Sequence, residues 1–267
     1  MWRGFWKLVF DPFLGPERRF VSTETHDEAL ARLIATIDSA QRSVVLRGSE
    51  GLGKSMLLAR MAALVKRPGR RVAIIDRPCD GAAMIRGLLE GLGVHVRMGS
   101  SRPIAWKALT DAVKVCHWQK VHPILVVDDV RDLVNEEDRR DLARLVHLAD
   151  GSGGPLTIVV AECEAEAEVD PRAGAWDRSI RLLPLTRSET GRYVASKLAA
   201  ARRFEPAFTP RAVGRLHDFS LGVPRGIDRL ASLALMAGAL RRLDPVTPDV
   251  IDEVARECDF SLGEFAA

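Results

Sequence analysis

One stretch of the sequence decides the fold: Gly48-Ser49-Glu50-Gly51-Leu52-Gly53-Lys54-Ser55. It fits the pattern G-x-x-x-x-G-K-[ST], follows an apolar, strand-like run at residues 43–47 and precedes a helical run at residues 56–65. In this setting the glycines let backbone N–H groups turn inward around a phosphate, and the N-terminus of the next helix adds its positive dipole end. The stretch therefore predicts a phosphate-binding loop that joins a strand to a helix.

Two side chains at the end of this stretch have predicted chemical roles. Lys54 would reach the β- and γ-phosphates of a nucleotide, and the hydroxyl of Ser55 would hold Mg²⁺. The cofactors predicted from the motif are therefore ATP and Mg²⁺. The nucleotide-binding residues expected here are Gly48, Ser49, Glu50, Gly51, Leu52, Gly53, Lys54, Ser55 and Met56.

Composition indicates a cytoplasmic globular protein. The chain has 267 residues, of which 47% are hydrophobic, and a formal net charge of +3. We find no run of about 18 apolar residues and no signal-peptide pattern at the start, so neither a membrane segment nor secretion is expected. The cysteines are scattered without C-x-x-C pairing, which favours reduced thiols over disulfides or zinc; they are Cys79, Cys116, Cys163 and Cys258.

The order of elements predicts an α/β domain followed by a helical one. Buried strand patterns alternate with helices, which predicts a parallel sheet with right-handed crossovers. Later patterns are helical, with prolines at or near three helix starts. The strands are expected at residues 43–47, 72–75, 124–127, 156–161 and 179–183, and the later helices at 188–202, with Ser188 as N-cap, 210–219, 224–240 and 248–258. The predicted parts are an aromatic segment packing on the core (1–24), a nucleotide-binding α/β domain (25–184), a helical lid (185–258) and a tail (259–267).

A pair of carboxylates ends the third predicted strand. Asp128 and Asp129 follow the apolar residues 124–127, at the sheet edge where ligands gather in open α/β folds. We expect Asp128 to complete the Mg²⁺ site with Ser55. Asp129 is the candidate for polarising the attacking water, so Lys54, Asp128 and Asp129 are the predicted catalytic residues.

Other charged residues have weaker signals. Glu162 ends a buried strand and would need a cationic partner near phosphate, so an acidic surface loop at 162–170 is the favoured interpretation. Arg225 opens the longest predicted helix, where a guanidinium could bind a phosphate or lie on the surface. The aromatic residues of the first 13 positions predict either a hydrophobic latch or a wall of the adenine pocket.

These residues together resemble the ExeA/GspA-type AAA+ ATPases of the general secretion pathway. The resemblance covers about residues 5–242 and rests on the phosphate loop and five other motifs, namely Asp11-Pro12-Phe13, the helix 26–33, Val126-Val127-Asp128-Asp129, Leu183-Pro184-Leu185 with Glu189 and Tyr193, and Gly222-Val223-Pro224-Arg225. That family is similar to ATP-dependent transposition regulators and origin-recognition ATPases.

The resemblance implies an ASCE P-loop core with a helical lid, ATP and Mg²⁺ bound between core and lid, and assembly into rings or filaments that act on a protein or DNA partner. It assigns Lys54 and Ser55 to Walker A, Asp128 to Walker B, the neighbourhood of Glu162 to sensor 1 and Arg225 to sensor 2. The trans-acting arginine finger stays open among Arg172, Arg178 and Arg181. Asp129 stands where the family usually has Glu, which predicts slow hydrolysis.

Two other functions are compatible with these motifs. A STAND-type signalling switch often ends its Walker B strand in Asp-Asp, although such switches usually have Gly-Leu-Pro-Leu where this chain has Gly222-Val223-Pro224-Arg225. An ATP-dependent DNA-binding module with little hydrolysis would use the arginine pairs 139–140, 202–203 and 241–242. Salt-dependent DNA binding would distinguish this last function.

Overall fold

The computed structural model describes residues 2–14, 20–97, 100–151, 153–163 and 176–258. By their internal contacts these residues divide into two compact units. The sheet unit contains residues 28–48 and 54–182, and the helical unit contains residues 1–27, 49–53 and 183–267. Within the described ranges, no helix has the length and apolar character needed to cross a membrane.

A five-stranded parallel sheet forms the centre of the sheet unit, in the order β2-β3-β4-β1-β5. The three central strands are buried almost throughout, which explains their continuous Val- and Ile-rich runs. All five expected strands are present, with ends that differ by no more than two residues. They are β1 (Ser43–Gly48), β2 (Arg70–Asp76), β3 (His122–Asp128), β4 (Thr157–Cys163) and β5 (Arg178–Arg181).

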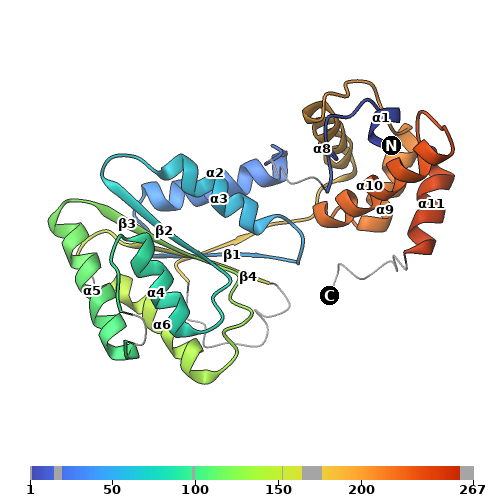
Figure 1. Ribbon diagram of the computed structural model, residues 1–267. Coiled ribbons are helices and arrows are strands. Elements are labelled where there is room, and N and C mark those ends of the chain that lie inside the picture. Colours follow the sequence, from blue (N-terminus) through green and yellow to red (C-terminus); the bar gives the residue numbers. More distant parts are fainter. Residues whose placement is uncertain (1, 15–19, 98–99, 152, 164–175, 259–267) are drawn as a thin grey trace. The chain divides into compact units, whose positions relative to one another are not determined.

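Helices cover both faces of this sheet (Figure 1). One face carries α2 (Glu24–Asp38) and α3 (Lys54–Val65), and the other carries α4 (Gly81–Gly91), α5 (Arg102–Trp118) and α6 (Glu136–Asp150). Asp80 caps α4 by accepting a hydrogen bond from the N–H of Ala83 at 2.6 Å. Helix α4 lies so close to β2 that a Cβ added at Gly91 would be 2.6 Å from the Cβ of Ala73. A glycine is therefore required at this helix–sheet contact.

The helical unit contains α8 (Arg187–Ala200), α9 (Pro210–Ser220), α10 (Pro224–Leu240) and α11 (Pro248–Glu257). Proline is the first residue of the last three, where its missing N–H costs least. The expectation that Ser188 caps α8 was wrong. Thr186 is the N-cap, and it forms a capping box with Glu189.

The N-terminal aromatic residues belong to the core of the helical unit. A short helix, α1 (Trp2–Phe5), precedes Trp6, whose indole N–H donates to the carbonyl of Leu235 at 2.7 Å. Trp6 and Phe13 are buried among the helices of this unit. The sequence allowed a hydrophobic latch or a wall of the adenine pocket. These contacts agree with the latch, because the segment packs on the helices of this unit.

Candidate functional site

The phosphate loop begins at the end of β1 and ends in the first turn of α3. Gly48 is the last residue of β1, residues 49–53 form the loop, and Lys54, Ser55 and Met56 are the first residues of α3. Within the sheet unit, the ammonium Nζ of Lys54 donates to the carbonyl of Gly48 at 2.6 Å. Burial lowers the pKa of Lys54, while Cys163, Asp129 and Asp128 act in the opposite direction. The Lys54 ammonium group is therefore held close to Gly48, the first residue of the phosphate-loop motif.

Two loop glycines have backbone conformations that other residues rarely adopt. Gly51 has φ of 81° and Gly53 has φ of 96°. Within the helical unit, a Cβ at Gly51 would lie 2.8 Å from the Cβ of Arg225, and one at Gly53 would lie 3.3 Å from Nε2 of His26. Both glycines are therefore required by backbone conformation, and Gly51 also by space.

His26 supports the loop, and the sequence reasoning did not assign it a role. Its Nε2 donates to the carbonyl of Leu52 at 2.8 Å, because a carbonyl oxygen only accepts. Its Nδ1 is 2.8 Å from the hydroxyl of Thr23, and both side chains are buried. The available signal was a histidine in the first turn of a helix that also appears in the family resemblance, which does not by itself indicate a contact to the phosphate loop.

Asp128 lies beside Ser55, as the magnesium prediction requires. The hydroxyl of Ser55 is close enough to lower the pKa of the Asp128 carboxylate, which is buried at the end of β3. Burial raises the pKa of Asp128, the charges of Asp76 and Asp129 raise it further, and Ser55 and Lys54 oppose this rise. A divalent cation at this position would stabilise the ionised carboxylate.

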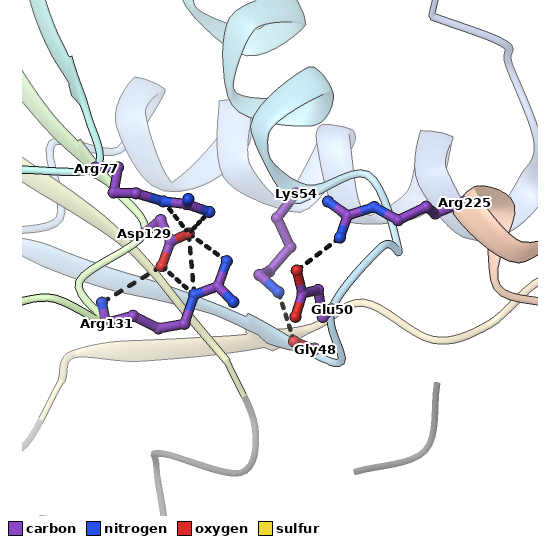
Figure 2. Close-up of polar contacts among 7 residues, drawn as sticks. All are labelled: Gly48, Glu50, Lys54, Arg77, Asp129, Arg131 and Arg225. Atoms are coloured by element: carbon purple, nitrogen blue, oxygen red, sulfur yellow. Dashed lines mark hydrogen bonds and ion pairs between the residues drawn. The ribbon is translucent and has the colours of Figure 1, made fainter. Parts of the chain in front are cut away.

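Asp129 has an environment very different from that of its neighbour. Its carboxylate accepts hydrogen bonds from Arg131 at 2.7 and 2.9 Å and from Arg77 at 2.9 and 3.1 Å (Figure 2). Burial favours a higher pKa, but the hydrogen bonds from Arg131 and Arg77 outweigh it and lower the pKa of Asp129 to about 2. Its φ of 60° is left-handed, which aspartate tolerates better than most residues. We call Asp129, Arg77 and Arg131 the Asp129 corner.

Glu162 is not part of an acidic surface loop, which corrects the favoured sequence interpretation. It is the sixth residue of β4, it is buried, and it forms an ion pair with Arg47 of β1. Arg47 and Glu162 are register partners in the parallel β1–β4 pairing. The cationic partner that the sequence reasoning required therefore exists, on the neighbouring strand.

Arg225 contacts the phosphate loop within the helical unit. Its guanidinium is 2.6 Å from the Glu50 carboxylate (Figure 2), and its backbone N–H donates to the carbonyl of Gly51 at 3.2 Å. Of the three candidate arginine fingers, Arg178 and Arg181 lie at exposed positions of strand β5, and Arg172 lies outside the described residues.

The residues of the sheet unit suit a nucleotide with Mg²⁺. Lys54 supplies a cation, and Ser55 and Asp128 supply the oxygen ligands that Mg²⁺ prefers. No group of three or more His, Cys, Asp or Glu side chains that could hold a metal occurs among the described residues. Mg²⁺ is commonly held by one or two protein ligands together with phosphate oxygens and water.

The chain has relatives among known proteins. Residues 37–168 match the family described as AAA domain. General secretion pathway protein A of Aeromonas hydrophila is 26% identical over 259 residues, which cover 90% of this chain and 45% of the relative. The chain thus spans less than half the length of that relative.

Solved structures share the fold. Cdc6p from Pyrobaculum aerophilum matches with a TM-score of 0.71 and 20% identity, covering 94% of this chain and 71% of that one. The Aeropyrum pernix ORC2 protein, solved as ADPNP–ADP complexes, matches with a TM-score of 0.66 and 13% identity, covering 94% and 72%. Together with the parallel sheet that carries the phosphate loop, these likenesses show that the chain has the fold of the AAA+ ATPases, and residues 37–168 of it resemble an AAA domain.

Proposed function

We propose that this protein is an ATPase that binds ATP with Mg²⁺ at residues 48–56 and uses the nucleotide state to control self-assembly and action on a partner. The observation that carries the proposal is the cluster formed by Lys54, Ser55 and Asp128 at the carboxyl ends of β1 and β3. Ligands gather at this edge in open parallel sheets.

Each residue of the cluster has a role that its position supports. Lys54 neutralises phosphate charge, and the loop N–H groups of residues 49–53 bind phosphate oxygens. Ser55 and Asp128 hold Mg²⁺, which when bound offsets charge on the phosphates. Arg225 contributes from the helical unit as a sensor of the terminal phosphate, because it already contacts Glu50 and Gly51 of the loop.

Hydrolysis is proposed to be slow. Asp129 follows the Mg²⁺ ligand and is the candidate for orienting the attacking water. Its side chain is one methylene shorter than that of Glu, and its carboxylate is held by two guanidinium groups. A carboxylate with a pKa of about 2 is a weak base, so water activation has to follow a change in these contacts.

The proposed partner is a second copy of this chain together with a protein or DNA target in the cytoplasm. Assembly into a ring or filament would let an arginine such as Arg178 or Arg181 act on a neighbouring subunit, since both are exposed. The alternatives are a switch of the STAND type or a DNA-binding module with little hydrolysis, which would apply if Asp129 stayed paired with its arginines when ATP is bound. Binding without turnover would distinguish these two from an ATPase.

Calorimetry with ATP and Mg²⁺ tests the nucleotide site. Lys54→Ala should weaken ATP binding by about 10- to 100-fold, because it removes a charge-assisted contact of about 1.5–3 kcal/mol. Arg140→Ala is the matched control, since Arg140 is exposed on α6 and pairs with Glu136. Equal affinity in the wild type and Lys54→Ala would disprove the site.

A further inference from the structure

The Asp129 corner brings two guanidinium groups to one carboxylate. Arg77 follows β2, Arg131 lies just beyond β3, and both guanidinium groups bind Asp129. One carboxylate bears a single negative charge, so the three side chains together are cationic. The strand ends place them at the edge of the sheet to which Asp128 belongs, and the backbone N–H of Arg77 donates to the carbonyl of Asp128 at 2.7 Å.

Of the two arginines of this corner, Arg131 is the one nearer to Lys54. Its charge acts on Lys54 of the same unit, as expected for two neighbouring cations. Figure 2 shows its guanidinium on the side of Asp129 that faces Lys54 and Gly48. The Arg131 side chain is 30% exposed, so an oxyanion from solvent can reach it.

We propose that Arg131 binds the terminal phosphate of the nucleotide within its own chain, and that Asp129 positions it for this contact. The inference rests on the proposed nucleotide site. Arginine stays charged, and its planar fork fits carboxylate and phosphate oxygens in the same bidentate way. The guanidinium can therefore exchange one oxyanion for the other without losing its hydrogen bonds.

Arg77 makes this exchange inexpensive for Asp129. When Arg131 turns to the phosphate, the Asp129 carboxylate keeps the two hydrogen bonds from Arg77 and is not left as an unpaired charge. One edge of the carboxylate then becomes available to orient a water molecule. A single side chain would thus sense the third phosphate and prepare Asp129.

The experiment compares the affinities of the full chain for ADP and for a non-hydrolysable ATP analogue, both with Mg²⁺, by titration calorimetry. Arg131→Ala should weaken binding of the analogue about tenfold or more and change ADP affinity by no more than about twofold. Arg131→Lys, which keeps the charge but not the fork, should lose less. Arg77→Ala should reduce the analogue-to-ADP preference less than Arg131→Ala does, and Arg140→Ala is the surface control.

Each outcome decides the inference. A merely structural role for Arg131 would weaken both nucleotides equally, and that result would overturn it. An unchanged preference in Arg131→Ala, or a larger loss in Arg77→Ala, would also overturn it. If Lys54→Ala no longer binds either nucleotide while Arg131→Ala keeps the preference for the analogue over ADP, only this inference fails. If the wild type binds neither nucleotide, the proposed function fails as well. Should Arg131→Ala not fold, Arg131→Lys with an unreduced preference would still refute the contact.

Discussion

Two of the arginine–carboxylate arrangements among the candidate site residues, the Asp129 corner and the Arg225–Glu50 pair, differ in burial. In the Asp129 corner, the carboxylate is 15% exposed and accepts several hydrogen bonds from Arg77 and Arg131. In the helical unit, Glu50 is 45% exposed and Arg225 is 57% exposed, and one side-chain contact of 2.6 Å joins them. The same pair of chemical groups is therefore used in two settings.

The difference indicates which contact is easier to exchange for a phosphate. Exposed ion pairs contribute about 0–1 kcal/mol, because water already solvates both charges. Bidentate pairs that are partly shielded are stronger and fix the orientation of the guanidinium. Arg225 can leave Glu50 at little cost, whereas Arg131 is held in a defined position until a competing oxyanion arrives.

The largest expected effect comes from Asp129→Asn. An uncharged amide can neither act as a base toward water nor form ion pairs with the two guanidinium groups, so ATP turnover should fall about 100-fold. ATP affinity should change by only a few-fold, because Lys54 and Ser55 remain. Phosphate release and calorimetry measure these two quantities, and Asp132→Asn is the control for a nearby exposed carboxylate. Equal turnover in both variants would remove Asp129 from the chemistry and favour a nucleotide switch.

A smaller effect is expected for Arg225→Ala. If Arg225 contacts the terminal phosphate, the variant should bind ADP normally, and its preference for ATP over ADP should fall about tenfold. ATP-dependent self-association, followed by sedimentation velocity, should fall with it. Arg241→Ala is the matched control in the same unit, since Arg241 forms an exposed pair with Glu253. A variant that assembles with ATP as fully as the wild type would return Arg225 to a surface role.

The sequence predicted those parts of the fold that depend on local pattern. The five strands and the proline-started helices were identifiable because burial on both faces gives continuous apolar runs and because proline suits a first helical turn. The phosphate loop was identifiable because its glycines, lysine and serine are contiguous. The assignment of roles to these residues remains a prediction.

The contacts that depend on strand order were not predictable from one sequence. Arg77 and Asp129 are 52 residues apart, and they meet because β2 and β3 are neighbours in the sheet. Glu162 was assigned to a surface loop because the sequence did not show its ion-pair partner. That partner, Arg47, lies on β1, which is far from β4 in the sequence and is its neighbour only in the sheet. His26 was missed because its partner is a backbone carbonyl, which leaves no trace in a side-chain pattern.

The smallest expected effect is that of Glu50→Ala, and it tests the comparison most directly. Because the Glu50–Arg225 contact is exposed, its loss should change stability by less than about 1 kcal/mol, or a few degrees in Tm. Removing a negative charge from the phosphate loop and releasing Arg225 should raise ATP affinity by at most about fivefold. Glu253→Ala, which removes another exposed carboxylate partner of an arginine, should leave ATP affinity unchanged. A decrease in ATP affinity with Glu50→Ala would mean that Glu50 holds Arg225 in its working position, and the two arrangements would then act in the same way, each carboxylate orienting an arginine for phosphate.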